Sequence, residues 1–209
     1  SRLIVATRTS TALALLGTLF GAILGILLGF IAAHRQGVTD EIISTVIDFQ
    51  AAMPYFIIAL AILAFMGNSM VVFLILMGLY GWEKYARITR GLVLSAKEHG
   101  YALAQQALGA SPGRTYFRHI FPNILSPLIV QMTINLPETI LFETSLSFLG
   151  LGIRPPMTSL GQMIGEGRDY LVSAWWLAVI PGAIIFFTTL SVSIVGDAIR
   201  SRLDPSLQD

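Results

Sequence analysis

The chain of 209 residues is strongly apolar: 55% of its residues are hydrophobic, 12% are charged and its mean hydropathy is +0.74. Soluble globular domains hold about 45–50% apolar and about 25% charged residues, so this composition predicts a membrane protein. The net charge of +1 says little as a total, because the positions of the charges along the chain decide membrane orientation. The absence of cysteine excludes disulfides, thiolate metal sites and cysteine nucleophiles.

Three apolar segments fill the first half of the chain. Residues 11–33 carry no charge and, at about 1.5 Å per residue, reach roughly 34 Å, enough to cross a hydrocarbon core of about 30 Å. Residues 42–66 form the second segment, and we expect a break in it at Met53 and Pro54. Residues 70–82 are short, but their helical pattern continues toward Lys97, which predicts one long helix that projects into solvent.

Two further segments follow in the second half. Residues 123–148 are apolar but contain prolines and acids, and residues 174–196 are free of charge. Trp175 and Trp176 stand at the start of the last segment, where an interfacial aromatic belt would lie. The sequence therefore predicts an all-α membrane protein with about five transmembrane helices in a single domain, residues 1–209.

Basic residues set the predicted orientation, because lysine and arginine gather on the cytoplasmic side. If the first segment runs inward, nine basic residues face the cytoplasm and four face outward. The nine are Arg35, Lys84, Arg87, Arg90, Lys97, Arg114, Arg118, Arg200 and Arg202, and the four are Arg2, Arg8, Arg154 and Arg168. Residues 83–122 are thus predicted to be a cytoplasmic loop, and residues 149–173 an external one, in a multi-pass cell-membrane protein.

A polar, glycine-broken stretch interrupts the cytoplasmic loop. Residues 98–108 are rich in good helix formers, Gly109 permits a helix stop, and Ser111 with Pro112 can start a second short helix. An apolar face at helical spacing consists of Leu103, Ala104, Ala107 and Leu108. This face either packs under the membrane helices of the chain or docks in a groove of a cytosolic partner.

Four glycines organise the first segment. Gly17, Gly21, Gly25 and Gly29 recur at every fourth residue, a pattern that permits close backbone approach between membrane helices. The pattern predicts helix packing, but it leaves open whether the neighbouring helix belongs to this chain or to a partner.

Acidic residues lie inside two of the segments. A carboxylate at the bilayer centre costs about 2.5–3.5 kcal/mol on insertion scales, so Glu138 and Glu143 should point away from lipid. Five residues apart, they lie roughly 140° apart around a helix and should not act as a pair. Candidates for lining a translocation pathway are Met53, Pro54, Pro137, Glu138 and Glu143. A polar anchor near the outer interface is the alternative for Glu143, and a structural role is equally open for Glu138. Asp48 should be a structural acid that pairs with an arginine.

The sequence does not predict an enzyme. A P-loop needs a lysine directly after a glycine, but the two lysines, Lys84 and Lys97, follow glutamate and alanine. His34, His99 and His119 fall in predicted cytoplasmic stretches and have no second histidine or cysteine at metal-ligand spacing. We therefore expect no cofactor and no metal bound by this chain, and no nucleic-acid partner.

Several ordered stretches resemble the permease subunits of ATP-binding cassette (ABC) importers. The tripeptide Leu103-Ala104-Gln105, with Gly109 and Pro122, is similar to the EAA loop of these permeases, although leucine replaces the family's glutamate and glutamine replaces an alanine. ETSLSFLGLGIRPPMTSLGQMIGEGRDYL (143–171), FRHIFPN (117–123) and GDAIRSRLDP (196–205) resemble the dipeptide/oligopeptide/nickel branch. The similarity runs from about Arg8 to Pro205.

The resemblance implies a type I importer permease core in a bacterial inner membrane. It implies a second, related permease that completes the pathway, two cytosolic subunits that bind ATP and Mg, and an external solute-binding protein. The residues that would dock on the ATPase are Leu103, Ala104, Gln105, Ala107, Leu108, Gly109, Ala110 and Ser111. Permeases of this branch carry a further amino-terminal helix, which we expect to precede Ser1.

Under this interpretation residues 149–173 form a partly re-entrant external cap, with Arg154 and Arg168 as candidate contacts to the binding protein. A plain connector is the alternative. Peptides are the expected substrate, with nickel or metal chelates as the alternative within the same architecture. A rival of another class is an ATP-independent channel or secondary transporter, since prolines beside acids also mark discontinuous pathway helices.

Overall fold

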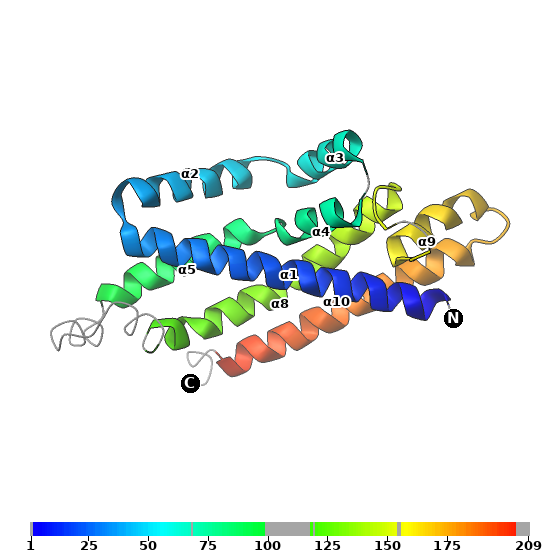
Figure 1. Cartoon of the computed structure of the whole chain (residues 1–209). Helices are drawn as coiled ribbons and strands as arrows, with labels where there is room; N and C mark the ends of the chain where they lie inside the picture. Colours follow the sequence, from blue (N-terminus) through cyan, green and yellow to red (C-terminus); the bar gives the residue numbers. More distant parts are fainter. Residues whose placement is uncertain (1, 68, 99–117, 119, 154–155, 204–209) are drawn as a thin grey trace.

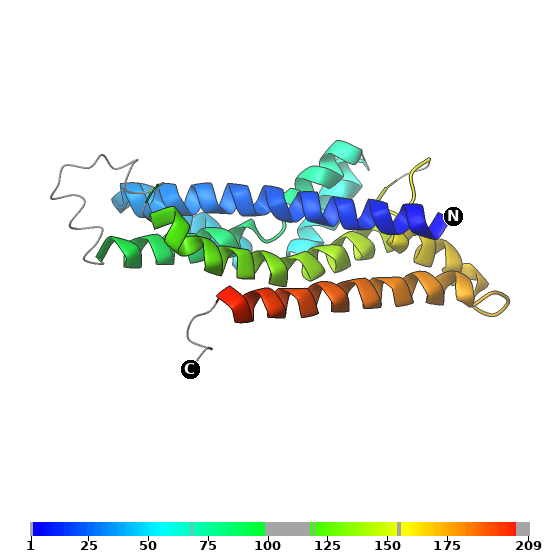
Figure 2. The same ribbon diagram turned by 90° about the horizontal axis from the view of Figure 1, so that it is seen from below.

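Three long helices run side by side and give the molecule its length (Figure 1). They are α1 (Arg2–Arg35), α8 (Phe121–Phe148) and α10 (Trp176–Leu203). The computed structural model describes residues 2–67, 69–98, 118, 120–153 and 156–203, and these residues form helices and connecting turns without a strand. Successive long helices are antiparallel, and α8 packs against both of the others (Figure 2).

The second predicted segment is two helices joined at a sharp bend. Helix α2 (Gly37–Ala52) and helix α3 (Tyr55–Met66) meet at 88° around Met53 and Pro54. Proline lacks a backbone N–H and restricts the residue before it to extended conformations, and Met53 is extended, with ψ of 139°. The break predicted at this dipeptide is confirmed.

The third segment is also interrupted, and the expectation of one continuous helix from residue 70 to Lys97 was wrong. Helix α4 (Met70–Gly78) ends before a tight turn, and α5 (Trp82–Glu98) begins after it. Gly81 in this turn has φ of +82°, a left-handed conformation that glycine adopts without steric cost. No proline marks this break, so the apolar and helical patterns continue through it in the sequence.

We predict that Gly81→Ala destabilises the protein more than Gly150→Ala. Both glycines have a positive φ, +82° and +79°, so both substitutions carry a similar backbone penalty of about 1–2 kcal/mol. A Cβ atom at Gly81 would also lie 2.7 Å from the side-chain oxygen of Asn135, whereas nothing lies within 4 Å at Gly150. Thermal unfolding of the two purified variants measures the difference, and equal melting temperatures would show that the Asn135 contact is unimportant.

A short helical element caps the end of the bundle at which α1 begins (Figure 1). Helix α9 (Leu160–Gly167) starts at Ser159, whose hydroxyl accepts a hydrogen bond from the backbone N–H of Gln162 at 3.2 Å. The 3-10 helix η2 (Arg168–Tyr170) continues it. Helix α9 packs against α8 and α10, so the segment between the last two long helices is folded onto the bundle.

By length and apolarity, α1, α8 and α10 can each cross a membrane, and the bent pair α2–α3 is a fourth candidate span. Helix α4 has nine residues, about 14 Å, and is too short to cross alone. The α4–α5 segment accounts for the remaining one of the five predicted segments. In this way the described ranges correspond to the predicted order of segments, with two of the five interrupted rather than straight.

Candidate translocation site

Two interruptions of helical structure and a proline inside a helix lie at the same level of the bundle. Gln50, one turn before the α2–α3 bend, donates to the carbonyl of Leu79 in the α4–α5 turn at 2.9 Å and accepts from the indole N–H of Trp82 at 2.7 Å. On the other side of that turn, Gly81 lies against Asn135, two residues before Pro137 within α8. A bend, a turn and a helix proline therefore meet here, where backbone groups lose their regular helical partners.

The depth of this level follows from the contact between α1 and the start of α5. A Cβ atom at Gly25 would lie 2.7 Å from the Cβ atom of Tyr85. Gly25 is eight residues, about 12 Å, from the end of the apolar stretch at Ala33 and about 21 Å from its start. If residues 11–33 span the membrane, as the length and apolarity of α1 allow, the interruptions lie at the depth of its hydrocarbon core.

An aromatic cluster forms one wall beside the interruptions. Tyr80 stacks on Phe142 with ring centroids 4.4 Å apart, and Tyr55 lies 5.6 Å from Phe142. The hydroxyl of Tyr55 donates to the carbonyl of Leu76 at 2.9 Å. The cluster joins α3, the α4–α5 turn and α8; Phe142 is buried in it, and the rings of Tyr55 and Tyr80 are partly buried.

A charged pair lies next to this wall. The ammonium of Lys84 contacts Oε2 of Glu138 at 2.5 Å, and each side chain is 39% exposed. Glu83, the neighbour of Lys84, accepts a hydrogen bond from Gln50 at 3.1 Å. The structure thus places Glu138 in an ion pair that the sequence did not predict, because its partner is 54 residues away and was assigned to the cytoplasmic loop.

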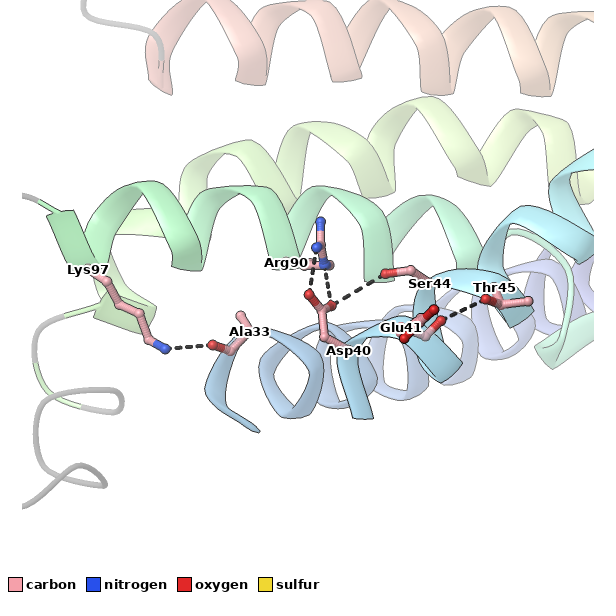
Figure 3. Close-up of polar contacts among 7 residues, drawn as sticks. All are labelled: Ala33, Asp40, Glu41, Ser44, Thr45, Arg90 and Lys97. Atoms are coloured by element: carbon pink, nitrogen blue, oxygen red, sulfur yellow. Dashed lines mark hydrogen bonds and ion pairs between the residues drawn. The ribbon is translucent and has the colours of Figure 1, made fainter. Parts of the chain in front are cut away.

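Two more ion pairs follow along α5. Arg87 contacts Asp48 at 2.8 Å, which confirms that Asp48 pairs with an arginine. Arg90 forms a two-bond contact with Asp40, at 2.5 and 2.7 Å (Figure 3). Both pairs join α5 to α2. The charges on α5 are therefore arranged as successive bridges to neighbouring helices.

At its far end, α5 is also tied to α1. Lys97 donates to the carbonyl oxygen of Ala33 at 2.5 Å, as Figure 3 shows. The last carbonyls of a helix have no partner within it, so a lysine at this position satisfies one of them and complements the helix dipole. Helices α1, α2 and α5 are held together by these contacts directly before the chain enters residues 99–117.

The four glycines of α1 lie against this same chain. A Cβ atom at Gly17, Gly21 or Gly29 would lie 2.6–3.0 Å from a backbone carbonyl oxygen of α4 or α5, namely those of Met77, Gly78 and Ala86. At Gly25 the corresponding neighbour is the carbonyl of Trp82. The neighbouring helix, which the sequence left open, is therefore the α4–α5 segment.

Glu143 lies elsewhere, inside the bundle near α9. Its side chain is fully buried, and the hydroxyl of Ser147 donates to its Oε1 at 2.7 Å. The hydroxyls of Ser10 in α1 and Ser159 before α9 also face this carboxyl group. Ser10 in turn accepts from the backbone N–H of Leu160 at 3.1 Å. This arrangement resembles the polar anchor of the two roles considered for Glu143, since the side chain lines no surface of the chain.

The remaining predicted site residues are scattered. Met53 is 42% exposed at the α2–α3 bend, beside Pro54. Arg168 is exposed at the end of α9, and its Nε lies 3.6 Å from Oδ1 of Asp169. The predicted coupling-helix residues 103–111 and Arg154 lie outside the described residues. Within the ranges that are described, no three His, Cys, Asp or Glu side chains gather as a metal site would require.

The described helices thus form a bundle of membrane length with helix breaks and a half-exposed charged pair at one level. Two solved structures share the fold: the inward-facing MetNI methionine ABC transporter, with a TM-score of 0.76 over 97% of this chain and 96% of that one, and an amino acid ABC transporter crystallised with histidines, with a TM-score of 0.70 over 96% and 93%. Both are 18% identical in sequence.

Sequence comparison identifies the family. Residues 25–209 match the family model described as the binding-protein-dependent transport system inner membrane component. A di/tripeptide transport system permease protein of Pseudomonas aeruginosa is 34% identical over 100% of this chain and 69% of its own length. A glutathione transport system permease protein of Pectobacterium atrosepticum is 35% identical over 100% and 69%, and an oligopeptide transport system permease protein of Bacillus subtilis is 34% identical over 98% and 67%.

The chain belongs to the family of binding-protein-dependent transport system inner membrane components. It is a multi-pass permease subunit of an ABC importer in the inner membrane, and permeases of this family work with ATP-binding subunits and a substrate-binding protein.

Proposed function

We propose that this chain forms one half of the translocation pathway of a peptide importer. A second, related permease would complete the pathway, two cytosolic subunits would bind ATP and Mg, and an external binding protein would deliver the peptide. The relatives named for di/tripeptides, oligopeptides and glutathione support this substrate class, because all of these solutes contain peptide bonds.

The observation that carries the proposal is the half-exposed pair of Lys84 and Glu138 at hydrocarbon depth. Charged groups at this depth do not face lipid without a large cost in free energy, so the exposed side of the pair must face water or another protein. A pathway enclosed between two permease subunits supplies both. The two helix interruptions and the proline within α8 at the same level are typical of a solute pathway, since irregular backbone is tolerated at that depth only next to protein or water.

Reconstitution tests this function. The complete importer in vesicles should accumulate a radiolabelled dipeptide when ATP and the binding protein are supplied. Vesicles prepared without the ATP-binding subunits should accumulate none. Without those subunits, a channel would instead move the solute down its own concentration gradient, and a secondary transporter would move it together with an ion gradient. Uptake of that kind would refute the proposal.

The two short helices predicted on either side of Gly109 in the cytoplasmic loop, here called the cytoplasmic hairpin, are the proposed route of coupling. The ties from α5 to Asp40 and to Ala33 support this role, because a push on the chain after α5 would reach α1 and α2 as one body. We predict that Gly109→Leu or Ala104→Trp leaves the permease inserted but lowers uptake per ATP hydrolysed by about tenfold, an effect of roughly 1.4 kcal/mol on the coupled step.

The measurement is the ratio of peptide accumulated to phosphate released in the reconstituted importer. Arg114→Lys, which keeps the charge in the same loop, serves as the control for insertion and assembly. An unchanged ratio in both the Gly109 and the Ala104 variant would contradict the docking role of the hairpin.

A further inference from the structure

The pair formed by Lys84 and Glu138 is suited to more than holding two helices together. Most charged contacts of α5 join it to α2, whereas this one reaches across to α8 at the level of the interruptions. The two side chains are equally exposed and oppositely charged, and the partly buried ring of Tyr80 lies near Glu138. The site therefore offers a solute one cation, one anion and the partly buried ring of Tyr80.

We propose, resting on the peptide-importer function above, that Lys84 and Glu138 separate to hold the two charged termini of a passing peptide. The carboxylate terminus would bind the ammonium of Lys84, and the amino terminus would bind the carboxylate of Glu138. An apolar side chain of the peptide would lie on the ring of Tyr80. An extended dipeptide spans at most about 7 Å, a separation within the reach of a flexible lysine side chain.

An exchange of partners explains how charged termini cross this depth. A lone charge in a low-dielectric environment is costly, whether it belongs to the solute or to the protein. If each new contact replaces an old one, every charge keeps a partner while the peptide enters and while it leaves. The contact between Lys84 and Glu138 then closes behind the solute and restores the starting state.

The same chemistry argues against a bare metal cation as the solute at this site. The ammonium of Lys84 would repel it, and contact with Glu138 alone would leave most of its ligand positions unfilled. A zwitterion uses both members of the pair. The site thus narrows the solute class to molecules that carry one ammonium and one carboxylate group at their ends.

The first test compares uptake by the complete importer carrying Lys84→Met with Glu138→Gln, a double variant without either charge. The matched control is Arg87→Met with Asp48→Asn, which removes the neighbouring ion pair on the same helix. We expect dipeptide uptake at saturating binding protein to fall about tenfold or more in the first double variant and less than about twofold in the control. A purely structural pair predicts normal uptake once both charges are removed, and that result would overturn the proposal.

The second test does not depend on how well a variant assembles. Lys84 and Lys97 are the two lysines of the chain, so an amine-reactive reagent can be read at each by mass spectrometry. Millimolar dialanine should slow the labelling of Lys84 in the wild-type importer, whereas N-acetyl-dialanine amide, which lacks both charges, should not. Equal labelling of Lys84 with both peptides would overturn the proposal. If the wild type takes up no peptide at all, the proposed function fails. If it takes up peptide but dialanine does not slow the labelling of Lys84, only this inference fails.

Discussion

Replacing Gly25 with leucine is expected to lower the yield of folded importer at least about tenfold, because the α1–α5 contact at this position has no room for a side chain. A Cβ atom there would lie against the carbonyl oxygen of Trp82 and 3.0 Å from the backbone nitrogen of Ala86. Backbone atoms cannot rotate away as a side chain can, so the helices would have to separate along their length. Size-exclusion chromatography of the detergent-extracted complex measures the yield.

Gly91 provides the matched control on the partner helix. Nothing lies within 4 Å of a Cβ atom placed there. Gly91→Ala should therefore leave the melting temperature unchanged or raise it, since alanine favours a helix interior by about 0.5–1 kcal/mol over glycine. Gly25→Ala should lower it. If Gly25→Leu gives the wild-type yield, the packing of α1 on α5 described above is incorrect.

Glu143→Leu is expected to release α9 from the bundle. Leucine accepts no hydrogen bond, so the hydroxyl of Ser147 would remain buried without an acceptor, at a cost of about 1–3 kcal/mol. The loss would extend to Ser10 and Ser159, whose hydroxyls face the same group from α1 and from the start of α9. Limited proteolysis between residues 168 and 175 should become faster, and the melting temperature should fall.

Glu143→Gln separates the hydrogen bond from the charge. The glutamine side chain has nearly the same volume, and its carbonyl can still accept a hydrogen bond from Ser147. The free energy of unfolding of this variant should therefore fall by less than about 1 kcal/mol. Rapid cleavage in the glutamine variant as well would mean that the negative charge itself holds α9. Slow cleavage in both variants would mean that Glu143 does not hold α9 at all.

The order of the helices was predictable because it depends on local patterns. Local sequence is enough to predict a helix from the charge-free run of residues 11–33 and a bend from the dipeptide Met53-Pro54. The turn at Gly81 was missed for the opposite reason: its tertiary neighbour is Asn135, which lies against the glycine from a distant helix. A glycine in an apolar run indicates both close packing and a turn, and only the tertiary contact distinguishes them.

The candidate site was predictable in part. The cost of a buried acid identified Glu143 as inward-facing and indicated an arginine partner for Asp48. Glu138 is 39% exposed, and its orientation away from lipid stays a prediction. This cost could not assign Lys84 to Glu138, because a charge count along the chain treats every lysine near a membrane segment as part of a loop. The different surroundings of the two glutamates, one half exposed and one enclosed by serines, likewise depend on which helices lie next to α8.

The glycine contact of α1 determines which parts of the subunit can take part in gating. An interface made of side chains can settle into a second arrangement when rotamers change, but four glycines against main-chain carbonyls offer no alternative set of contacts. Helices α1, α4 and α5 should therefore keep one mutual geometry in every state of the transport cycle. The pathway must then open and close by movement at the α2–α3 bend and at the side-chain interfaces that α8 and α10 form.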